Sequence, residues 1–258
     1  MGEEILIVSY CFKKNGKKIM MRKKILAVIT ARGGSKRIPH KNIKKFCGKP
    51  IIEYSIEAAL NSNIFEEVMV STDDNEIAKI AQDAGAVVPF MRSEATSNDF
   101  ATTRDVLLEV LHEYKMKGKE FDYMVCLYPT NPFISFEKLM EAVNILVNEN
   151  CEEVIPVVKF SFPPQRAYIL NDEGGLVYKW DRYKDMRSQD LESFYHDAGQ
   201  FYCYDVQKYL DDNGEIKGKV RPILLSEYEV QDIDNEDDWK MAELKYEYIQ
   251  RNKGNLNE

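Results

Sequence analysis

The sequence predicts an α/β fold in which a mostly parallel sheet is covered by helices. Short apolar runs, the first at 24–30, alternate with amphipathic segments of helical length as far as residue 158. Such alternation is typical of βαβ units, whose parallel strands are joined by right-handed crossovers. Polar or glycine-rich segments follow three of the runs, at 31–42, 71–74 and 128–132. Ligands bind beyond the carboxyl ends of parallel strands, so we expect the functional site at these segments.

Length, charge and cysteine content limit the class of protein. The 258 residues suit one α/β domain with an elaboration. The net charge of −8 disfavours nucleic acid and anionic membranes as main partners, because both attract basic surfaces. Five cysteines without a close pair indicate reduced thiols in a cytoplasmic protein. Cys126 and Cys203 lie in apolar runs and are interpreted as core residues rather than catalytic thiols.

Capping and turn residues set the ends of the predicted elements. Pro50 begins a helix at 51–60, because proline pre-sets the dihedral angle of a first helical turn. Asp73 or Asp74 caps the next helix, at 75–84. Apolar spacing predicts further helices at 106–118, 136–148 and 235–251, strands at 67–71, 86–90, 121–128, 153–158, 200–204 and 222–225, and a hairpin around Gly214 and Gly218.

Two segments interrupt this regular order. Residues 1–22 place a basic run after a short apolar one, the wrong order for a signal peptide, and we expect a dispensable, disordered extension. The domain itself is expected at 23–250. Residues 159–200 leave the sheet, since the consecutive prolines 163–164 cannot belong to a regular helix. Aromatic residues on such an excursion indicate a subunit interface, which predicts a homodimer.

The segment 31–42 has the composition of a phosphate-binding loop. Gly33 and Gly34 allow the backbone to approach a ligand closely. Backbone N–H groups and cations that converge at the end of a strand can hold several phosphates. A solvated basic loop is the alternative. The cations of this segment and of the residues after it are Arg32, Lys36, Arg37, Lys41, Lys44 and Lys45.

Two familiar phosphate loops are excluded by the residues that follow the glycines. The dinucleotide-binding fingerprint requires a third glycine, and residues 36–39 contain none. The Walker pattern requires a second glycine followed by Lys and Ser or Thr, and Pro39 stands at the position of that glycine. Phosphate binding would therefore use a different architecture.

Carboxylates near the carboxyl end form a second candidate site. Asp232 and Asp234 are one residue apart, so in a strand both point to one face and Ile233 points to the core. Two close carboxylates repel unless a hard cation binds both, and Mg²⁺ adds phosphate and water ligands. The alternative is that Asp234 caps the next helix, with Asp237 in its first turn. A phosphate loop in the same chain favours the magnesium interpretation.

Four motifs together resemble the CMP-sialic acid synthetases, the acylneuraminate cytidylyltransferases, and occur in order between about residues 24 and 248. Three further segments look most like the pseudaminic acid cytidylyltransferases within that family. The first four are Ala31-Arg-Gly-Gly-Ser-Lys-Arg-Ile-Pro-His-Lys-Asn42, Ser71-Thr-Asp-Asp74, Tyr128-Pro-Thr-Asn-Pro132 and Gln231-Asp-Ile-Asp234; the others are Phe162-Pro-Pro-Gln-Arg-Ala167, Arg187-Ser-Gln-Asp-Leu191 and Tyr195-His-Asp-Ala-Gly-Gln-Phe-Tyr202.

The resemblance implies a Rossmann-like fold of the nucleotide-diphospho-sugar transferase type, with the excursion inserted for dimerisation and sugar binding. It implies that CTP and a nonulosonic acid give CMP-sugar and pyrophosphate, through in-line attack of the anomeric hydroxyl on the α-phosphate. Mg²⁺ would be held by Asp232 and Asp234, which count as catalytic together with Arg32 and Lys41.

The same resemblance assigns the remaining residues of the site. The two arginines of the excursion would reach the sugar of the partner subunit. Tyr128 stands where the sialic acid enzymes carry Gln, and His196-Asp197-Ala198 also departs from their pattern, which favours a nonulosonate other than N-acetylneuraminate. The assignments are Arg32, Gly33, Ser35, Lys36 and Lys41 for the triphosphate, Asn42, Arg92 and Thr103 for cytosine and ribose, and Tyr128, Arg166, Arg187, Gln189 and His196 for the sugar.

Three alternatives stay open from the sequence. The sugar would differ in a cytidylyltransferase for N-acetylneuraminate, legionaminate or the eight-carbon octulosonate. A glycosyltransferase also uses Asp-x-Asp with a metal, but there the motif is expected after a central strand, where this chain has 128–132. A nucleotide-sensing protein without catalysis would not need two carboxylates beside a complete basic loop.

Overall fold

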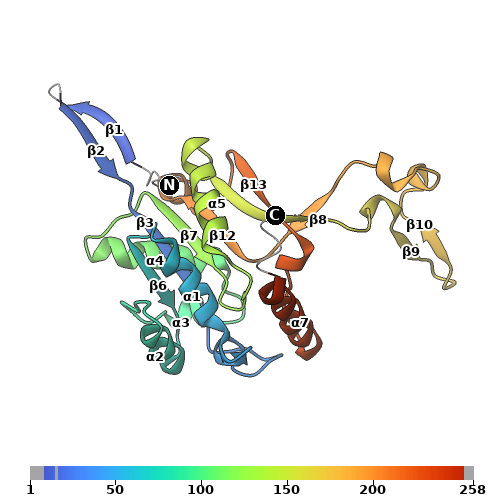
Figure 1. Cartoon of the computed structure of the whole chain (residues 1–258), viewed down its shortest axis with the longest axis horizontal. Helices are drawn as coiled ribbons and strands as arrows, with labels where there is room; N and C mark the ends of the chain where they lie inside the picture. Colours follow the sequence, from blue (N-terminus) through green and yellow to red (C-terminus); the bar gives the residue numbers. More distant parts are fainter. Residues whose placement is uncertain (1–8, 15–16, 253–258) are drawn as a thin grey trace.

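The centre of the computed structural model, which describes residues 9–14 and 17–252, is a mixed seven-stranded sheet (Figure 1). The strand order is β11-β8-β12-β7-β3-β6, and β13 also pairs with β8. Its strands are β3 (Ile25–Thr30), β6 (Glu67–Ser71), β7 (Tyr123–Leu127), β8 (Glu153–Lys159), β11 (Tyr195–Asp197), β12 (Phe201–Asp205) and β13 (Val220–Leu225).

The half of the sheet that carries the predicted site is parallel. β3 pairs in parallel with β7 on one side and with β6 on the other. The segments 31–42, 71–74 and 128–132, which follow these strands, therefore leave the same edge of the sheet. β12 lies between β7 and β8 and runs antiparallel to both, so the sheet as a whole is mixed.

Helices cover both faces of the sheet, which confirms the predicted α/β fold. Side chains alternate along β3: Ala27 and Ile29 belong to the apolar cluster of one face, and Leu26 and Val28 to that of the other. A strand buried on both faces reads as a continuous apolar run. The first face is covered by α1 (Ile51–Ser62), α2 (Asn75–Asp83) and α5 (Phe136–Asn148), and the second by α4 (Thr103–Met116) and α6 (Val206–Asp211), while α3 (Glu94–Ser97) buries no residue.

A third apolar cluster joins the two ends of the chain. Helix α7 (Glu236–Asn252) contributes Trp239, and the segment before it contributes Ile233. Both pack in one cluster with Ile38 of the basic loop and with Phe46, whose ring centroid lies 5.6 Å from that of Trp239. Burial of these large side chains holds the acidic segment against the basic loop.

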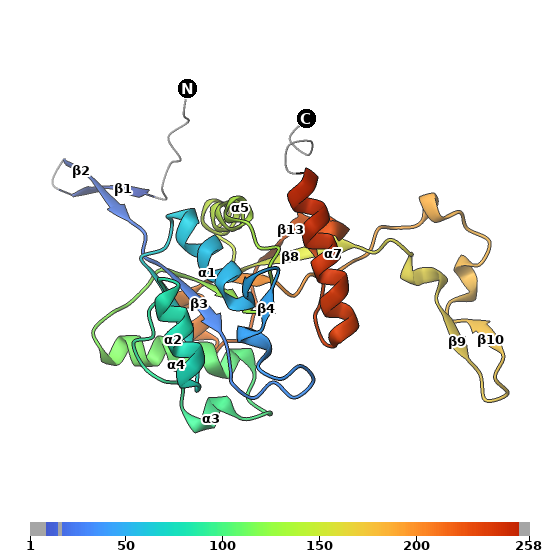
Figure 2. The ribbon, with the colours of Figure 1, turned by 60° about the horizontal axis from the view of Figure 1, so that its bottom comes forward.

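Residues 160–194, called the arm below, project away from the sheet (Figures 1 and 2). Within the arm, β9 (Tyr168–Leu170) and β10 (Leu176–Tyr178) form an antiparallel hairpin, with Leu170 opposite Leu176. These two leucine residues are 72% and 66% exposed. The chain rejoins the sheet at β11, five residues earlier than the predicted return at residue 200, because β11 pairs with the end of β8.

Two local predictions were wrong, and the condition set for the acidic pair was not met. Residues around Gly214 and Gly218 form no hairpin in the described structure, but connect the short helix α6, which the sequence analysis missed, to β13, a parallel partner of β8. The strand expected at 86–90 reduces to one bridge, from Val87 to Met69. No strand forms at 230–234, yet Ile233 is buried and Asp232 exposed as the predicted alternation requires.

The structure describes part of the amino-terminal segment. β1 (Ser9–Lys14) and β2 (Lys17–Arg22) pair with each other in an antiparallel sheet of their own, and β4 (Lys45–Phe46) and β5 (Lys49–Pro50) form another small pair. Residues 1–8, and the chain end expected to fray after Asn252, lie outside the described residues. No helix in the described part of the chain has the length and apolar character needed to cross a membrane.

Candidate active site

A cavity of about 470 Å³ opens at the edge where β3 and β7 end. The chain leaves β3 toward β6 on one side and returns to β7 on the other, so this is a topological switch point, where ligands of α/β sheets bind. The first cavity is lined by Thr30, Arg32, Ser35, Lys36, Arg37, Lys41, Asn42, Asp99, Tyr128, Pro129 and Thr130. It therefore brings together five of the residues predicted for nucleotide binding with Tyr128.

The cations of the first cavity are paired with an acid that the sequence analysis did not select. Arg32 Nη1 lies 2.8 Å from Asp99 Oδ1, and Lys36 Nζ contacts Asp99 Oδ2. Hydrogen bonds from Lys36 and Arg32 lower the pKa of Asp99. The Asp99 carboxylate thus pairs with the same two cations that the predicted triphosphate would need.

The glycine at position 33 is required by a close approach of two loops. Its N–H donates to Asp73 Oδ1 at 2.9 Å. A Cβ on Gly33 would lie 2.7 Å from Asp74 Oδ2, closer than real contacts allow. Asp74 cannot move away freely, because it caps α2 by accepting from the N–H groups of Glu76 and Ile77. This settles the predicted choice between Asp73 and Asp74 in favour of Asp74 as the cap.

The basic loop contacts the acidic segment directly. Arg37 Nη1 lies 2.7 Å from Asp234 Oδ2, and Lys41 Nζ donates to the carbonyl of Ile233 at 2.7 Å. Partial burial lowers the pKa of Lys41, while the carboxylates of Asp234 and Asp232 oppose the shift. The loop and the acidic pair, about 190 residues apart in the sequence, therefore form one electrostatic unit.

Helix α7 is capped by residues other than Asp234. Asn235 Oδ1 accepts from the N–H groups of Asp237 and Asp238, and Asp238 Oδ2 accepts from the N–H groups of Asp234 and Asn235. The alternative in which the Asp234 carboxylate caps α7 was therefore wrong. This carboxylate instead pairs with Arg37 at the rim of the loop.

The acidic pair fits a shared magnesium ion by its chemistry. Asp232 is exposed and lines a cavity, and Asp234 is half-buried beside the loop cations. Mg²⁺ takes one or two protein carboxylates and completes its shell with phosphate and water. No group of three or more His, Cys, Asp or Glu side chains among the described residues is placed to hold a metal.

A second cavity, of about 790 Å³, adjoins the first at Tyr128, which lines both. It contains His196, predicted to bind the sugar, and Asp232, predicted to bind the metal. Residues of β11, of the loop after it and of α7 complete its wall. The second cavity is lined by Tyr128, Val158, His196, Asp197, Ala198, Gly199, Glu227, Tyr228, Val230, Gln231, Asp232 and Lys245.

Two residues predicted to contact cytosine and ribose line neither cavity. Arg92 is buried and donates to the hydroxyl and the carbonyl of Ser71, at 3.0 and 2.6 Å, and burial lowers its pKa. Thr103 is the first residue of α4, and its Oγ1 lies 3.5 Å from the hydroxyl of Tyr128. Asn42 does line the first cavity, and its side chain donates to the carbonyl of Arg32.

Three residues predicted for the sugar lie on the arm. Arg166 donates to the hydroxyl of Ser188 at 3.1 Å, and Arg187 pairs with Asp190 at 2.7 Å. Gln189 lies in the same short helical turn as Ser188. None of the three lines either cavity within this chain, and the arm that carries them points away from the sheet (Figure 2).

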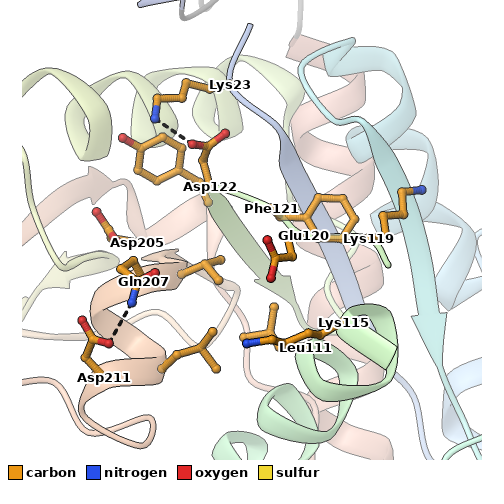
Figure 3. A pocket seen from close by; sticks show the side chains of 13 residues that line it. Lys23, Leu111, Lys115, Lys119, Glu120, Phe121, Asp122, Asp205, Gln207 and Asp211 are labelled. Atoms are coloured by element: carbon orange, nitrogen blue, oxygen red, sulfur yellow. Dashed lines mark hydrogen bonds and ion pairs between the residues drawn. The ribbon is translucent and has the colours of Figure 1, made fainter. Parts of the chain in front are cut away.

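A third cavity, of about 430 Å³, lies at the opposite edge of the sheet, where β3 and β7 begin (Figure 3). Two pairs of its polar side chains contact each other. Lys23 Nζ lies 2.7 Å from Asp122, and Gln207 donates to Asp211 at 2.7 Å. No predicted site residue lines it.

The thiols of the sheet behave as core residues. Cys126 and Cys203 are fully buried, and burial raises the pKa of Cys126 to about 12 and that of Cys203 further. A thiol with a raised pKa is a poor nucleophile at neutral pH. This agrees with the predicted structural role of both.

Sequence reasoning missed Asp99, Asp197 and Lys245, each of which lines a cavity. Asp99 meets Arg32 across 67 positions of the chain, so no local spacing signals the contact. Asp197 lies inside a motif that was selected, next to His196. The sequence could not show that Asp197 lies on an edge strand and lines a cavity.

Comparison with known proteins agrees with this geometry. A family model described as cytidylyltransferase matches residues 26–220. A pseudaminic acid cytidylyltransferase of Campylobacter jejuni is 39% identical over 224 residues, covering 86% of this chain and 96% of the relative. A CMP-N,N'-diacetyllegionaminic acid synthase of Legionella pneumophila is 34% identical and covers 88% of this chain and 98% of its own length.

Solved structures share the fold at lower identity. CMP:2-keto-3-deoxy-manno-octonic acid synthetase in complex with CTP matches with a TM-score of 0.63 and 21% identity, over 88% of this chain and 99% of that one. A 4-diphosphocytidyl-2C-methyl-D-erythritol synthase from Anaerococcus prevotii matches over the same shares with a TM-score of 0.59 and 18% identity. The model match, the two sequence relatives and the shared fold lead to one conclusion: this chain belongs to the cytidylyltransferase family and is a nucleotidyltransferase.

Proposed function

We propose that this enzyme transfers CMP from CTP to pseudaminate and releases pyrophosphate. One observation carries the proposal: Tyr128 lines both a cationic cavity and a neighbouring cavity that contains Asp232. A nucleotide in the first cavity and a sugar in the second would meet beside the acidic pair. This is the arrangement that a transfer between two bound substrates needs, because positioning supplies much of the rate.

The first cavity has the composition that a nucleoside triphosphate requires. Arg32, Lys36 and Lys41 provide cations, and the loop that carries them leaves the end of a parallel strand. Gly33 has no side chain, so the backbone at this turn can lie close to Asp74. In-line displacement at the α-phosphate demands neutralisation of charge on the departing pyrophosphate, and these cations would supply it.

Asp232, which lines the second cavity, and Asp234, which is paired with Arg37, would hold Mg²⁺. The bound ion would neutralise phosphate charge and lower the pKa of the sugar hydroxyl. Arg37 keeps the Asp234 carboxylate at the loop, and Lys41 keeps the backbone of Ile233 there. These two contacts would fix the carboxylate pair relative to the triphosphate before substrates arrive.

Pseudaminate is favoured among the nonulosonic acids by sequence. The Campylobacter pseudaminate enzyme is 39% identical to this chain and the Legionella legionaminate enzyme 34%. Tyr128 and the segment His196-Asp197-Ala198, which depart from the sialic acid enzymes, line the second cavity. Departures at the wall of that cavity would alter the sugar that it accepts and leave the transfer chemistry unchanged.

The arm supports a homodimer in which each subunit completes the site of its partner. Its hairpin exposes Leu170 and Leu176, a pair of apolar side chains that a partner would cover. Arg166, Arg187 and Gln189 lie on the same arm, outside the cavities of their own chain. In a dimer, guanidinium groups from the partner would bind the sugar carboxylate in a bidentate manner.

The decisive experiment is a sugar panel. The enzyme, CTP and Mg²⁺ are incubated separately with pseudaminate, legionaminate, N-acetylneuraminate and the eight-carbon octulosonate, and pyrophosphate release is followed. We expect the highest kcat/KM with pseudaminate and loss of release when the metal is chelated. Faster release with another acid would change the assigned sugar, and no release with any acid would overturn the proposed function.

A further inference from the structure

The second cavity contains a carboxylate whose two oxygens are both held by the protein. Asp197 Oδ1 accepts a hydrogen bond from the N–H of Gly199, and Oδ2 accepts one from the hydroxyl of Tyr202, each at 2.7 Å. A carboxylate has about four acceptor sites, so further acceptor capacity remains. Asp197 is exposed and lines the cavity, which makes this capacity available to a bound molecule.

The backbone around Asp197 is fixed as well. Asp197 lies on β11 opposite Val157 of β8, and the next N–H, that of Ala198, donates to the carbonyl of Pro156 at 2.9 Å. The Nδ1 atom of His196 lies 2.9 Å from the Asp197 carbonyl oxygen and donates to it. An acceptor held this firmly is pre-organised, so binding a donor loses little side-chain entropy.

The surroundings of Asp197 strengthen any hydrogen bond made there. Val158 and Ala198 are buried in an apolar cluster, with Val230 packed against it, and all three line the cavity. The Tyr202 ring packs against that of Tyr128, with centroids 5.4 Å apart. A bound sugar that covers this apolar wall would displace water from Asp197, and a matched donor would then gain affinity while an opposing acceptor would be rejected.

We propose that Asp197 is a specificity-determining residue, which accepts a hydrogen bond from an N–H or O–H group of the sugar and is positioned by Tyr202. The inference rests on the proposed function and deepens it. A sugar whose stereochemistry turns an acylamino N–H or a hydroxyl toward Asp197 is accepted. A sugar that turns a carbonyl or carboxylate oxygen toward it meets a negative charge and is discriminated against.

Asp197→Asn tests this with little disturbance of the fold. The side-chain oxygen of asparagine can still accept from the N–H of Gly199, and its amide nitrogen can donate to the hydroxyl of Tyr202. The substitution therefore keeps both local hydrogen bonds and removes the negative charge and one acceptor from the cavity. Asp83→Asn is the matched control, because Asp83 is exposed at the end of α2 and lines neither cavity.

Steady-state kinetics with the preferred sugar of the panel gives the readout. We expect Asp197→Asn to raise the KM for the sugar about 10- to 100-fold, with the KM for CTP and the melting temperature unchanged. Tyr202→Phe should raise the sugar KM less, about three- to tenfold, because it removes one hydrogen bond that positions the Asp197 carboxylate but keeps the carboxylate itself. A sugar KM within twofold of wild type in Asp197→Asn would overturn the inference.

Sugar analogues identify the donor and separate this inference from the proposed function. One analogue replaces each acylamino N–H by an ester oxygen, and another replaces single hydroxyls by hydrogen. The analogue that lacks the relevant donor should lose about 10- to 100-fold in kcat/KM with wild type and little further with Asp197→Asn. Equal losses in both enzymes would overturn the inference, whereas a wild type inactive toward every acid sugar would overturn the proposed function instead.

Discussion

Arg37 and Asp234, 197 positions apart in the sequence, form an ion pair with 2.7 Å between Nη1 and Oδ2. Beneath this pair, Ile38 and Ile233 are buried in the same apolar cluster, together with Trp239. The apolar contacts supply the free energy that brings the loop and the acidic segment together, because exposed ion pairs contribute little on their own. The ion pair then sets their relative orientation at the rim of the first cavity.

Asp234→Ala should lower kcat by on the order of 100-fold, because it removes a carboxylate predicted to hold the metal. Stability should change by less than about 1 kcal/mol, since Asn235 and Asp238 cap α7 and the Arg37 pair is exposed. Asp237→Ala is the control, because Asp237 is exposed in the first turn of the same helix. Pyrophosphate release and thermal melting measure both effects. A near-normal kcat would remove Asp234 from the site.

Lys41→Met should raise the KM for CTP by on the order of 10- to 100-fold, because a charged donor to the triphosphate is lost. Loss of the contact to the Ile233 carbonyl, 2.7 Å long, should also lower kcat by loosening the acidic pair. Lys45→Met serves as the control, since Lys45 is exposed in β4, soon after the loop, and lines neither cavity. Calorimetric titration with CTP checks the affinity, and unchanged binding would contradict the assignment.

Asp99→Asn should lower the KM for CTP by about two- to fivefold, since Asp99 competes with the triphosphate for Arg32 and Lys36. The effect should shrink at high salt, which screens both the ion pairs and the nucleotide. Glu94→Gln on the neighbouring helix α3 is the control. Asp105→Asn is unsuitable as a control, because Asp105 completes the capping box of α4. A raised KM for CTP would show instead that Asp99 helps to hold the cations in place.

Glu153 predicts a pH dependence of stability. Burial raises the pKa of this carboxyl to about 7, above the ordinary value of about 4.3 that it has in the unfolded chain. The folded state therefore binds the proton more tightly, and the resulting stability is complete below about pH 4 and is lost as the pH rises through 7. Between pH 5 and pH 8 this loss amounts to about 2 kcal/mol.

Glu153→Gln should remove that dependence, because the amide is neutral at every pH. Urea unfolding at pH 5 and pH 8 gives the free energy of unfolding, and the difference between the two values should be smaller by about 2 kcal/mol in the variant. Glu141→Gln, at an exposed position of α5, controls for a general effect of losing a carboxylate. Parallel pH curves for wild type and Glu153→Gln would contradict the prediction.

The Leu170→Asp and Leu176→Asp double variant should produce monomers, because two charges would replace apolar side chains that face each other across the hairpin. If Arg166 and Arg187 act on the partner, kcat/KM for the sugar should fall at least tenfold while CTP binding persists. Light scattering and kinetics measure both. Glu173→Gln in the hairpin turn is the control, and an unchanged dimer with normal activity would contradict this role of the arm.

Much of the architecture follows from local signals. The helix around 51–60 extends to Ser62, the helix predicted at 75–84 ends one residue earlier at Asp83, and that at 136–148 was placed to the residue. These elements have clear caps and apolar spacing, such as Asp74 at the start of α2. The differences occur where tertiary contacts decide: Val87 makes only one bridge, to Met69, and no strand forms around Ile233.

The sequence alone determined the α/β class, the basic loop, the acidic pair and the family, because each depends on residue types at short, fixed spacings. The tertiary structure decided which of those residues share a cavity, and it added Asp99 and Asp197 to the cavity walls. It also placed Arg92 outside both cavities, hydrogen-bonded to Ser71. Spacing along a chain cannot specify contacts between segments that only the packing of a common core brings together. Here that core is the cluster that buries Ile38 and Ile233 side by side with Trp239.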